Sequence, residues 1–325
     1  MRAIICREWG GVDSLTLSDI PSPKPGPSSL LIDVIATSAN FADLVMIAGN
    51  YQTRPSFPFA PGLEAVGIIS ECGSEVKNFK PGDRVMALLD YGGFAEQVVA
   101  EADVCFLVPD NMNNCTAAAF LIAYASSHVA LRWQAKLENQ ETLLVLGSAG
   151  GVGLTAIEIG KVIGARVIAG ASSNEKLELA KNRGADYIVN YSEEDIKSEV
   201  MAFTNHNGVD VCFDPIGGDL FDSALSSVGW GGRYLHIGFA GGIPKIPANR
   251  LLVKHRSAMG SALRFFRHHR PELLQKTVYE LIEWWQKGFL KLEIAGEWEL
   301  KNAIQALEQL NDRTVKGKAI IKIKS

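Results

Sequence analysis

A glycine-rich turn between an apolar strand and an apolar helix constrains this chain more than any other feature. Residues Leu143–Leu146 are consecutively apolar, as in a strand buried on both faces of a parallel sheet. The glycines that follow lead into the largely apolar segment Leu154–Lys161, which we expect to be a helix. Glycine serves three needs in such a turn: the tight bend, the close approach of a ligand pyrophosphate, and close helix packing. The sequence therefore predicts half of a βαβ unit with a phosphate site at the helix N-terminus.

The turn departs from the usual dinucleotide-binding fingerprint G-x-G-x-x-G, because Ser148 stands where the first glycine would be. A turn of this kind is also compatible with a purely structural role. The candidate cofactor contacts are the residues of the turn: Ser148, Ala149, Gly150, Gly151, Val152 and Gly153.

The end of the second expected strand, Ala165–Ala171, indicates which cofactor binds. It lies about 20 residues beyond the glycines, where an acidic residue binds the ribose 2′-hydroxyl of NAD. No Asp or Glu stands at that strand end, and the chain continues as Ser172-Ser173-Asn174-Glu175-Lys176. Serine hydroxyls and an ammonium suit a 2′-phosphate, so the sequence favours NADPH over NADH. The alternative is that Ser173 only caps the next helix and Lys176 is a solvated charge.

The pattern of the chain changes along its length. Residues 1 to about 110 contain short apolar runs separated by turn signals, which predicts a small barrel of antiparallel strands. Residues Asn40–Gly49 are expected to form a short helix capped by Asn40, and Thr116–Arg132 a long apolar helix. Strands and helices then alternate, as in a doubly wound parallel sheet. The expected strands are Leu143–Leu146, Val167–Ala171, Tyr187–Asn190, Val209–Asp214 and Arg233–Gly238.

The pattern of alternating strands and helices stops at about residue 260. Two helices, Pro271–Lys287 and Leu300–Leu310, and a last strand, Ala319–Ile323, are expected beyond it. This tail offers no separate core, so we expect it to return to the amino-terminal domain. The predicted domains are residues 1–121, 122–260 and 261–325, of which the first and last form one unit.

Composition excludes several classes of protein. The net charge is −4 and 21% of residues are charged, which does not suggest nucleic acid or an anionic membrane as partner. The apolar runs are shorter than the roughly 20 residues that span a bilayer, and charge comes too early for a secretory signal, so a cytoplasmic location is expected. The five cysteines form no C-x-x-C pair, which predicts reduced thiols and neither a disulfide framework nor a zinc cluster.

A succession of motifs covering the whole chain then points to a family. The motifs are Asn40-Phe41-Ala42-Asp43, Gly49-Asn50-Tyr51, Pro61-Gly62-Leu63-Glu64, Phe79–Val85, Gly92–Glu96, Gly150–Gly153, Gly184-Ala185-Asp186 and Asp214–Gly218. In their order and spacing the chain resembles the quinone oxidoreductase branch of the medium-chain dehydrogenase/reductase superfamily, the zeta-crystallin-like NADPH:quinone oxidoreductases. The resemblance implies an α/β protein with a GroES-like β-rich catalytic domain, made of both chain ends, and an inserted Rossmann domain with a doubly wound parallel sheet. It also implies NADPH in the cleft and a homodimer formed by sheet edges near Arg256–Ala262.

The resemblance also assigns roles to individual residues. It places Asn40 and Tyr51 beside the nicotinamide and the substrate, which makes them the candidate catalytic residues. Their alternative roles are helix cap and loop-packing aromatic. It places Tyr191 beside the adenosine 2′-phosphate, and it places four residues near the nicotinamide: Ser126, Ser127, Gly238 and Phe239. Asp214 is more simply explained as the end of a strand before a proline turn.

The chain departs from the zinc alcohol dehydrogenases of the same superfamily at their catalytic zinc ligands. It has Asn40 instead of cysteine, Leu63 instead of histidine, and no cysteine between Thr116 and Leu131. Zinc needs three or four N, S or O ligands, so we predict no catalytic metal. An isolated carbonyl needs a Lewis acid or a strong proton donor, whereas a quinone or conjugated enone spreads the developing charge over its own π system. The predicted reaction is therefore hydride transfer from NADPH to a quinone or α,β-unsaturated carbonyl.

Two other functions remain open at this point. The basic and aromatic segment Ala262–Arg270 is either a solvated helix start or a handle for an anionic substrate. In the second case the enzyme is a 2-enoyl-CoA thioester reductase. The other alternative is an NADPH-binding structural protein with little turnover, because the turn and the 2′-phosphate residues indicate binding rather than catalysis.

Overall fold

The structure is a computed structural model that describes residues 1–324, and its contacts divide the chain into two compact units. The first unit contains residues 1–122 together with the chain from Leu292 onward, and the second contains Ala123–Lys291. The first boundary lies within helix α2 (Asn114–His128).

The second boundary differs from the prediction, because residues 261–291 belong to the second unit and not to the first. Helix α9 explains the difference. Its buried face packs within the second unit, and the indole N–H of Trp133 donates to the Thr277 hydroxyl at 2.8 Å. His128 at the end of α2 is hydrogen-bonded to Glu280 of α9 at 3.1 Å. The return to the first unit therefore begins only at Leu292.

The second unit is built on a six-stranded parallel sheet of order β10-β9-β8-β11-β12-β13. The strands are β8 (Thr142–Leu146), β9 (Arg166–Ala171), β10 (Tyr187–Asn190), β11 (Val209–Asp214), β12 (Val228–His236) and β13 (Ser257–Gly260). The helices that follow α2 are a π-helical turn (Val129–Gln134), α3 (Gly151–Ile163), α4 (Asn174–Asn182), α5 (Ile196–Phe203), α6 (Phe221–Ser227), α7 (Ala248–Leu252), α8 (Leu263–His269) and α9 (Pro271–Gln286). The strand order reverses between β8 and β11, and ligands of doubly wound sheets bind at such a point, outside the carboxyl ends of the strands.

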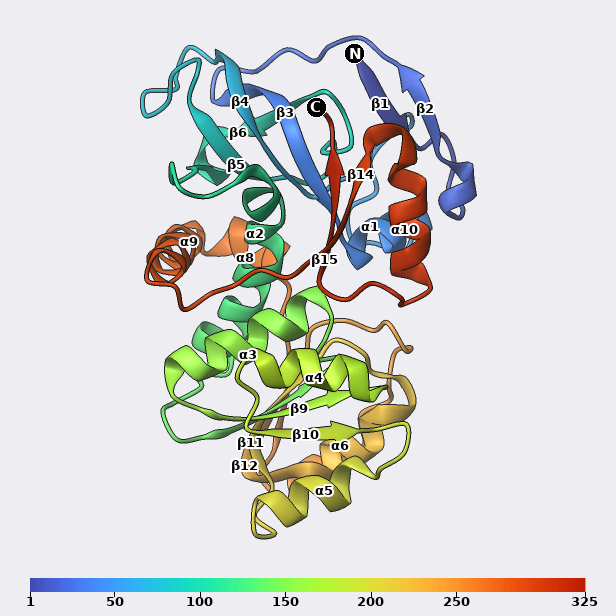
Figure 1. The fold of residues 1–325 in the computed structure, drawn as a ribbon, viewed down its shortest axis with the longest axis vertical. Coiled ribbons are helices and arrows are strands. Elements are labelled where there is room, and N and C mark those ends of the chain that lie inside the picture. The colour runs from blue at the N-terminus through green and yellow to red at the C-terminus, as the bar shows by residue number, and fades with distance from the viewer. Residues whose placement is uncertain (325) are drawn as a thin grey trace. The chain divides into compact units, whose positions relative to one another are not determined.

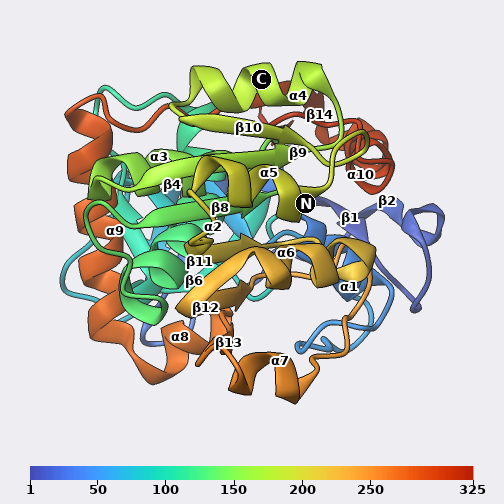
Figure 2. The same ribbon diagram turned by 90° about the horizontal axis from the view of Figure 1, so that it is seen from below.

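Helices cover both faces of this sheet. Figure 1 shows α3 and α4 along one face, and Figure 2 looks onto the sheet with α5 and α6 on the nearer side. The core on the α5 and α6 side contains side chains from the strands and from both helices, among them Leu144, Cys212, Val200 and Phe221. The prediction of a doubly wound sheet is confirmed.

The first unit is β-rich, as predicted. Its main sheet has the order β14-β15-β3-β4-β5-β7, with β6 also paired to β3; β14 and β15 run parallel and the other pairs antiparallel. The elements are β1 (Arg2–Ile5), β2 (Thr16–Asp19), β3 (Ser29–Ala39), α1 (Phe41–Ile47), β4 (Glu64–Cys72), β5 (Arg84–Leu88), β6 (Gln97–Glu101), β7 (Cys105–Leu107), β14 (Ile294–Glu299), α10 (Ala303–Asn311) and β15 (Lys318–Lys322). The pairing of β3 with β15 joins two segments far apart in the sequence.

Several expected elements differ in their ends. Strand β12 begins at Val228 rather than Arg233 and ends at His236, so Gly238 lies in the loop beyond it. Strand β13 was not expected, because its sequence, Ser-Ala-Met-Gly, carries no apolar run.

Helix α2 and the π-helical turn after it form a 21-residue helical segment, Asn114–Gln134, whose most apolar 18-residue stretch has a mean hydropathy of 1.2. By length and composition this segment could cross a membrane, contrary to the expectation that no run would be long enough. However, 72% of its most apolar part is buried inside the protein. The segment is therefore explained as a core helix.

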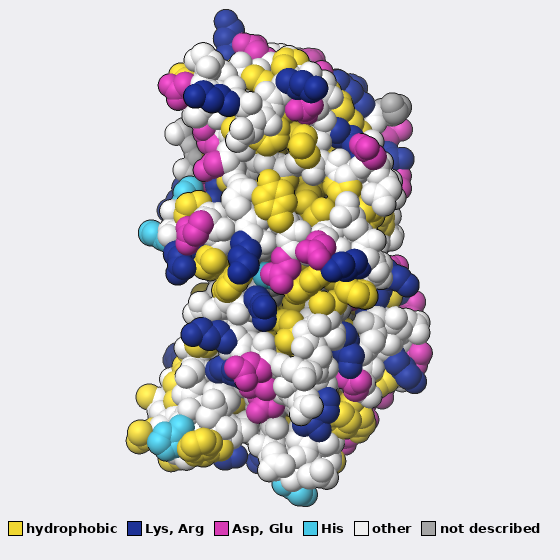
Figure 3. Space-filling model, turned by 90° about the vertical axis from the view of Figure 1, so that its left-hand side faces the viewer, with side chains coloured by type: hydrophobic (Ala, Val, Ile, Leu, Met, Phe, Trp, Pro, Cys, Tyr) yellow, Lys and Arg dark blue, Asp and Glu magenta, His cyan; other side chains and the backbone are white. Residues whose placement is uncertain are grey.

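Charged side chains of both signs are mixed on the surface that Figure 3 presents, with Lys and Arg beside Asp and Glu. Such mixing is typical of a solvated surface.

Candidate functional site

The glycine turn joins β8 to α3 as predicted. Gly147 has φ +57°, a conformation that side chains with a Cβ rarely adopt, and Gly150 stands at the N-cap position of α3. A Cβ on Gly153 would lie 2.3 Å from the carbonyl oxygen of Gly147. Glycine at position 153 is therefore required for α3 to pack this closely against the turn.

The same turn fits a pyrophosphate. Among residues 1–324, no side chain caps the first N–H groups of α3, and the buried hydroxyl of Ser148 has no hydrogen-bond partner. A Cβ on Gly150 would meet only the Gly147 carbonyl oxygen, at 3.3 Å, so space remains beside the turn. Unpaired helical N–H groups next to an open backbone form a ready anion site.

The residues predicted to hold a 2′-phosphate lie together at the carboxyl end of β9. The Lys176 ammonium donates to the Ser172 hydroxyl at 3.3 Å, and the Ser173 hydroxyl accepts from the Lys176 N–H at the start of α4. The Tyr191 N–H donates to the carbonyl oxygen of Ala171 at 3.1 Å. The cap predicted for Ser173 is confirmed, and the side-chain contact of Lys176 with Ser172 provides the donors that a phosphate needs.

Ser127, one of two serines expected near the nicotinamide, is fully buried in α2. Its hydroxyl donates to the Val152 carbonyl oxygen at 2.9 Å and is 2.8 Å from the Thr155 hydroxyl. These contacts hold α2 against α3, so the Ser127 hydroxyl already has partners in the core. Ser126, beside it, is half-buried.

Gly238 and Phe239 lie in the loop after β12, at the carboxyl edge of the sheet. Phe239 is 44% exposed. The loop is held to the end of β11: the Ile237 N–H donates to the Asp214 carbonyl oxygen, and the Ala240 N–H to that of Pro215. The Asp214 carboxylate accepts from the Tyr234 hydroxyl and from the backbone N–H groups of its own loop. Asp214 is thus a structural acid.

His236, at the end of β12, was not singled out in the sequence. It is buried, its ring lies near those of Phe221 and Phe239, and neither ring nitrogen has a hydrogen-bond partner among the described residues. Burial lowers the pKa of His236, so the neutral form is favoured.

A buried polar cluster surrounds Asn40 in the first unit. Asn40 is 8% exposed at the N-terminus of α1, and its amide nitrogen donates to the Ser38 carbonyl oxygen at 3.2 Å and to Glu64 at 3.2 Å. The Lys318 ammonium donates to the Asn40 Oδ1 at 2.5 Å and to Glu64 at 3.3 Å. Sequence reasoning missed Ser38 and Lys318, and Lys318 gave no signal because it is 278 residues away.

Asp43 completes this cluster. Its carboxylate accepts from the N–H of Asn40 at 2.8 Å and from the N–H of Gly62 at 3.0 Å. Complete burial nevertheless raises the pKa of Asp43 to about 7, although these hydrogen bonds and Lys318 oppose the shift.

The Asp43 pKa has a consequence for stability. Between pH 4 and 7 the folded protein keeps the Asp43 proton, which the unfolded chain, with a carboxyl pKa near 3.8, has released. The wild-type free energy of unfolding should therefore fall as pH rises through this range. Asn at position 43 should flatten the dependence, as urea unfolding at pH 5 and pH 8 would show. Parallel pH profiles for wild type and Asp43→Asn would contradict the raised pKa.

Tyr51, the second candidate catalytic residue, packs against the hydrophobic core of the first unit and is half-buried. It follows the end of α1, where Gly49 turns the chain with φ +73°. Asn40 and Tyr51 thus belong to one unit, and all the candidate cofactor residues belong to the other.

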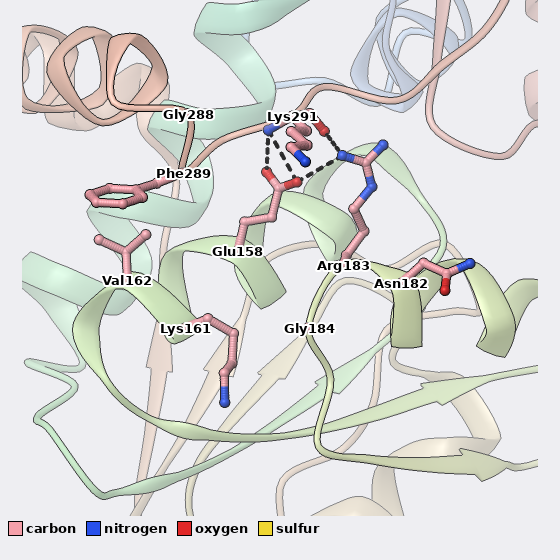
Figure 4. A pocket seen from close by; sticks show the side chains of 9 residues that line it. All are labelled: Glu158, Lys161, Val162, Asn182, Arg183, Gly184, Gly288, Phe289 and Lys291. Carbon is pink, nitrogen blue, oxygen red and sulfur yellow. Dashed lines mark hydrogen bonds and ion pairs between the residues drawn. The ribbon is translucent and has the colours of Figure 1, made fainter.

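A cavity of about 500 Å³ lies elsewhere in the second unit, at the carboxyl ends of α3 and α4. It includes none of the predicted site residues. Figure 4 shows Glu158 beside it, with the Arg183 guanidinium and the Lys291 N–H donating to its carboxylate at 3.0 and 3.2 Å. The Tyr124 hydroxyl donates to the same carboxylate at 2.7 Å. Burial raises the pKa of Glu158, against the opposing effect of these donors.

This carboxylate should contribute to stability. Gln in place of Glu158 keeps the shape and removes the charge that Arg183 and Tyr124 face. We expect the free energy of unfolding to fall by about 2–3 kcal/mol in chemical denaturation. Glu199→Gln is the matched control, since Glu199 accepts from the Tyr187 hydroxyl at the same 2.7 Å but is partly exposed. An equal loss of unfolding free energy in the two variants would show that the burial of Glu158 adds nothing to stability.

Comparison with known proteins agrees with this architecture. Residues 26–110 match the alcohol dehydrogenase GroES-like domain, and residues 151–283 match the zinc-binding dehydrogenase domain. Two domains of the dehydrogenase families therefore account for most of the chain.

Individual relatives narrow the class further. The chain is 34% identical to quinone oxidoreductase-like protein 2 of Rattus norvegicus over 326 residues, covering 99% of this chain and 92% of that protein. It is 32% identical to the quinone oxidoreductase of Mus musculus, covering 95% and 94%. The structure of Escherichia coli quinone oxidoreductase complexed with NADPH superimposes with a TM-score of 0.94 at 27% identity, covering 99% and 100%. The chain belongs to the quinone oxidoreductase-like proteins of the medium-chain dehydrogenase/reductase superfamily.

The name of the second matched domain raises the question of zinc. In residues 1–324, no group of three or more His, Cys, Asp or Glu side chains is placed to hold a metal ion. Freshly purified protein is expected to contain far less than one zinc per chain by inductively coupled plasma analysis. Stoichiometric zinc would contradict the prediction of a metal-free site.

Proposed function

We propose that this protein is an NADPH-dependent oxidoreductase that transfers hydride to a quinone or an α,β-unsaturated carbonyl. The proposal rests on two features of the second unit. The N-terminus of α3 is uncapped at an open glycine turn, and Lys176 and Ser172 lie at the end of the next strand. NADPH bound in the E. coli relative supports the same cofactor.

The residues of the second unit bind and orient the cofactor in this proposal. The N–H groups at the start of α3 bind the pyrophosphate, and Lys176 with the Ser172 hydroxyl binds the 2′-phosphate. The loop at Gly238 and Phe239 borders the nicotinamide. When bound, the nicotinamide supplies the hydride.

The residues of the first unit act on the substrate. Asn40 donates a hydrogen bond to the substrate carbonyl oxygen, where negative charge develops during hydride transfer, and Tyr51 shapes the pocket or donates a second bond. Hydride transfer itself requires no proton donor from the protein, because a quinone or enone delocalises the developing negative charge. Proximity and orientation then provide most of the rate enhancement.

A substrate panel tests the proposal. Absorbance at 340 nm would be followed with NADPH and then NADH against a para-quinone, an ortho-quinone, an alkenal and a crotonyl thioester. Turnover of quinones or the alkenal with a strong preference for NADPH is expected. Turnover of the thioester alone would favour the 2-enoyl-CoA reductase and direct attention to α8. Binding of NADPH without oxidation by any acceptor would favour a binding protein.

We also propose a homodimer formed through β13. This strand stands at the edge of the parallel sheet, and three large side chains on neighbouring segments are highly exposed: Trp230 at 75%, Leu252 at 76% and Val253 at 73%. An exposed edge strand beside apolar side chains is suited to pairing with a second copy. Light scattering after size exclusion should give twice the chain mass, and Val253→Asp should lower it. A monomeric wild type would refute the dimer.

A further inference from the structure

We infer that Lys318 is a positioning residue for the reaction: it holds the side-chain amide of Asn40 with its nitrogen as the hydrogen-bond donor to a substrate carbonyl oxygen. The inference rests on the proposed function and adds a residue to it. Lys318 begins β15, which pairs with β3 immediately before Asn40.

The Lys318 side chain is enclosed within the first unit, with 5% of its surface exposed. Its ammonium donates to three acceptors: the Asn40 Oδ1 at 2.5 Å, the Glu64 Oε1 at 3.3 Å and the Ala39 carbonyl oxygen at 3.4 Å. Glu64, with 1% exposed, supplies the opposite charge that a buried ammonium needs. The contact with Asn40 is the shortest of the three.

The ammonium determines the orientation of the Asn40 amide. An ammonium can only donate, so the atom that it contacts at 2.5 Å must be the amide oxygen. The other end is then the NH₂ group. The Ser38 carbonyl oxygen, which can only accept, faces the NH₂ end and favours the same orientation, and Lys318 adds a charged donor on the amide oxygen.

The hydrogen bonds of the NH₂ group are weaker than the contact on the oxygen. The nitrogen lies 3.2 Å from the Ser38 carbonyl oxygen, 3.3 Å from the Ser38 hydroxyl and 3.2 Å from Glu64 Oε1. Bonds at this long end of the range are readily exchanged for a better acceptor. A cationic donor on the oxygen also polarises the amide and strengthens donation by its N–H groups. The cluster therefore fixes one end of Asn40 and leaves the other able to bind an oxygen on which negative charge develops.

Lys318→Met tests this role by steady-state kinetics with a series of para-quinones of rising reduction potential. We expect kcat to fall about 10- to 100-fold for the quinones that are hardest to reduce. The loss should be smaller for the quinones that are easiest to reduce, because their reduction depends least on a hydrogen-bond donor from the protein. The KM for NADPH should stay within about twofold. Lys324→Met is the matched control: Lys324 is half-exposed and pairs with Asp33 at 3.4 Å, so its loss should leave both parameters unchanged.

A double variant shows whether Lys318 acts through Asn40. In an Asn40→Leu background, Lys318→Met should cause no further loss of kcat, since the group that it holds is gone. Additive losses of kcat in the double variant would overturn the inference. Wild-type rates in Lys318→Met alone, with an unchanged dependence on reduction potential, would also overturn it. If Lys318→Met does not fold, Lys318→Gln replaces it, because the Gln side chain is polar but one bond shorter and uncharged, so it should still lose the cationic contact with the Asn40 Oδ1.

A measurement on the cofactor-free protein separates this inference from the proposed function. In the ¹⁵N spectrum, the Asn40 side-chain amide should exchange slowly with solvent in wild type and rapidly in Lys318→Met. Equal exchange in both proteins would show that Lys318 does not hold Asn40. A wild type that reduces no acceptor would instead overturn the proposed function, and with it the catalytic role of the Lys318–Asn40 contact. The exchange rates would still show whether that contact exists.

Discussion

Alanine at Gly153 is expected to abolish nucleotide binding and to lower the free energy of unfolding by about 3 kcal/mol. The new Cβ would lie 2.3 Å from the Gly147 carbonyl oxygen, 2.8 Å from the Ser148 Cα and 2.9 Å from the Gly147 carbonyl carbon. All three are backbone atoms, so no side chain can rotate away and the turn itself must move. Chemical denaturation and fluorescence titration with NADPH measure the two effects.

Gly150→Ala is the matched control for this substitution. Gly150 has φ −78° and ψ 167°, which an alanine adopts without strain, and the nearest atom to its Cβ would be 3.3 Å away. We expect nearly wild-type stability but weaker NADPH binding, because the methyl group would occupy the space beside the uncapped N–H groups. If Gly150→Ala binds NADPH as tightly as wild type does, the phosphate does not lie at this turn.

The second large effect concerns the choice of cofactor. Lys176→Ala should raise the dissociation constant of NADPH about 10- to 100-fold while changing that of NADH by less than about twofold. The Lys176 ammonium donates to the Ser172 hydroxyl at the end of β9. This is the expected position of the 2′-phosphate, the group that distinguishes NADPH from NADH. Calorimetric titration at two salt concentrations should also show a weaker salt dependence for the variant.

Lys181→Ala controls for a general loss of positive charge from the same helix, since Lys181 is an exposed residue of α4. It should leave both affinities unchanged. An equal loss of NADPH and NADH in Lys176→Ala would instead mean that Lys176 supports the fold of the site and does not contact the 2′-phosphate.

The sequence predicted those parts of the molecule that depend on neighbouring residues. The turn from Leu146 to Gly153, the cap at Ser173 and the limits of β10 and β11 all follow from local patterns of apolar residues, glycines and caps. The residue types alone also suggested Asp214 as the structural end of a strand.

The predictions failed where distant segments meet. The domain limit at residue 261 was wrong because α9 packs against Trp133 and His128, a contact that its own amphipathic pattern does not specify. The apolar sequence of the helix Asn114–Gln134 does not by itself distinguish burial in a core from burial in a bilayer, because both select the same residues. In the sequence, Lys318 is an ordinary charged residue at the start of a short strand. The pairing of β3 with β15 brings it to Asn40.

That pairing sets an order for the making of the protein on the ribosome. Asn40, Asp43 and Glu64 are synthesised early, but Lys318 emerges only after the whole second unit, Ala123–Lys291. At about 5–20 residues per second, the 254 residues from Glu64 to Lys318 take on the order of 10–50 s to synthesise, and the Glu64 carboxylate lacks its cation during that time. The second unit, continuous in sequence, can fold during that interval. The polar cluster around Asn40 can therefore assemble only after the second unit has been synthesised, when β15 pairs with β3.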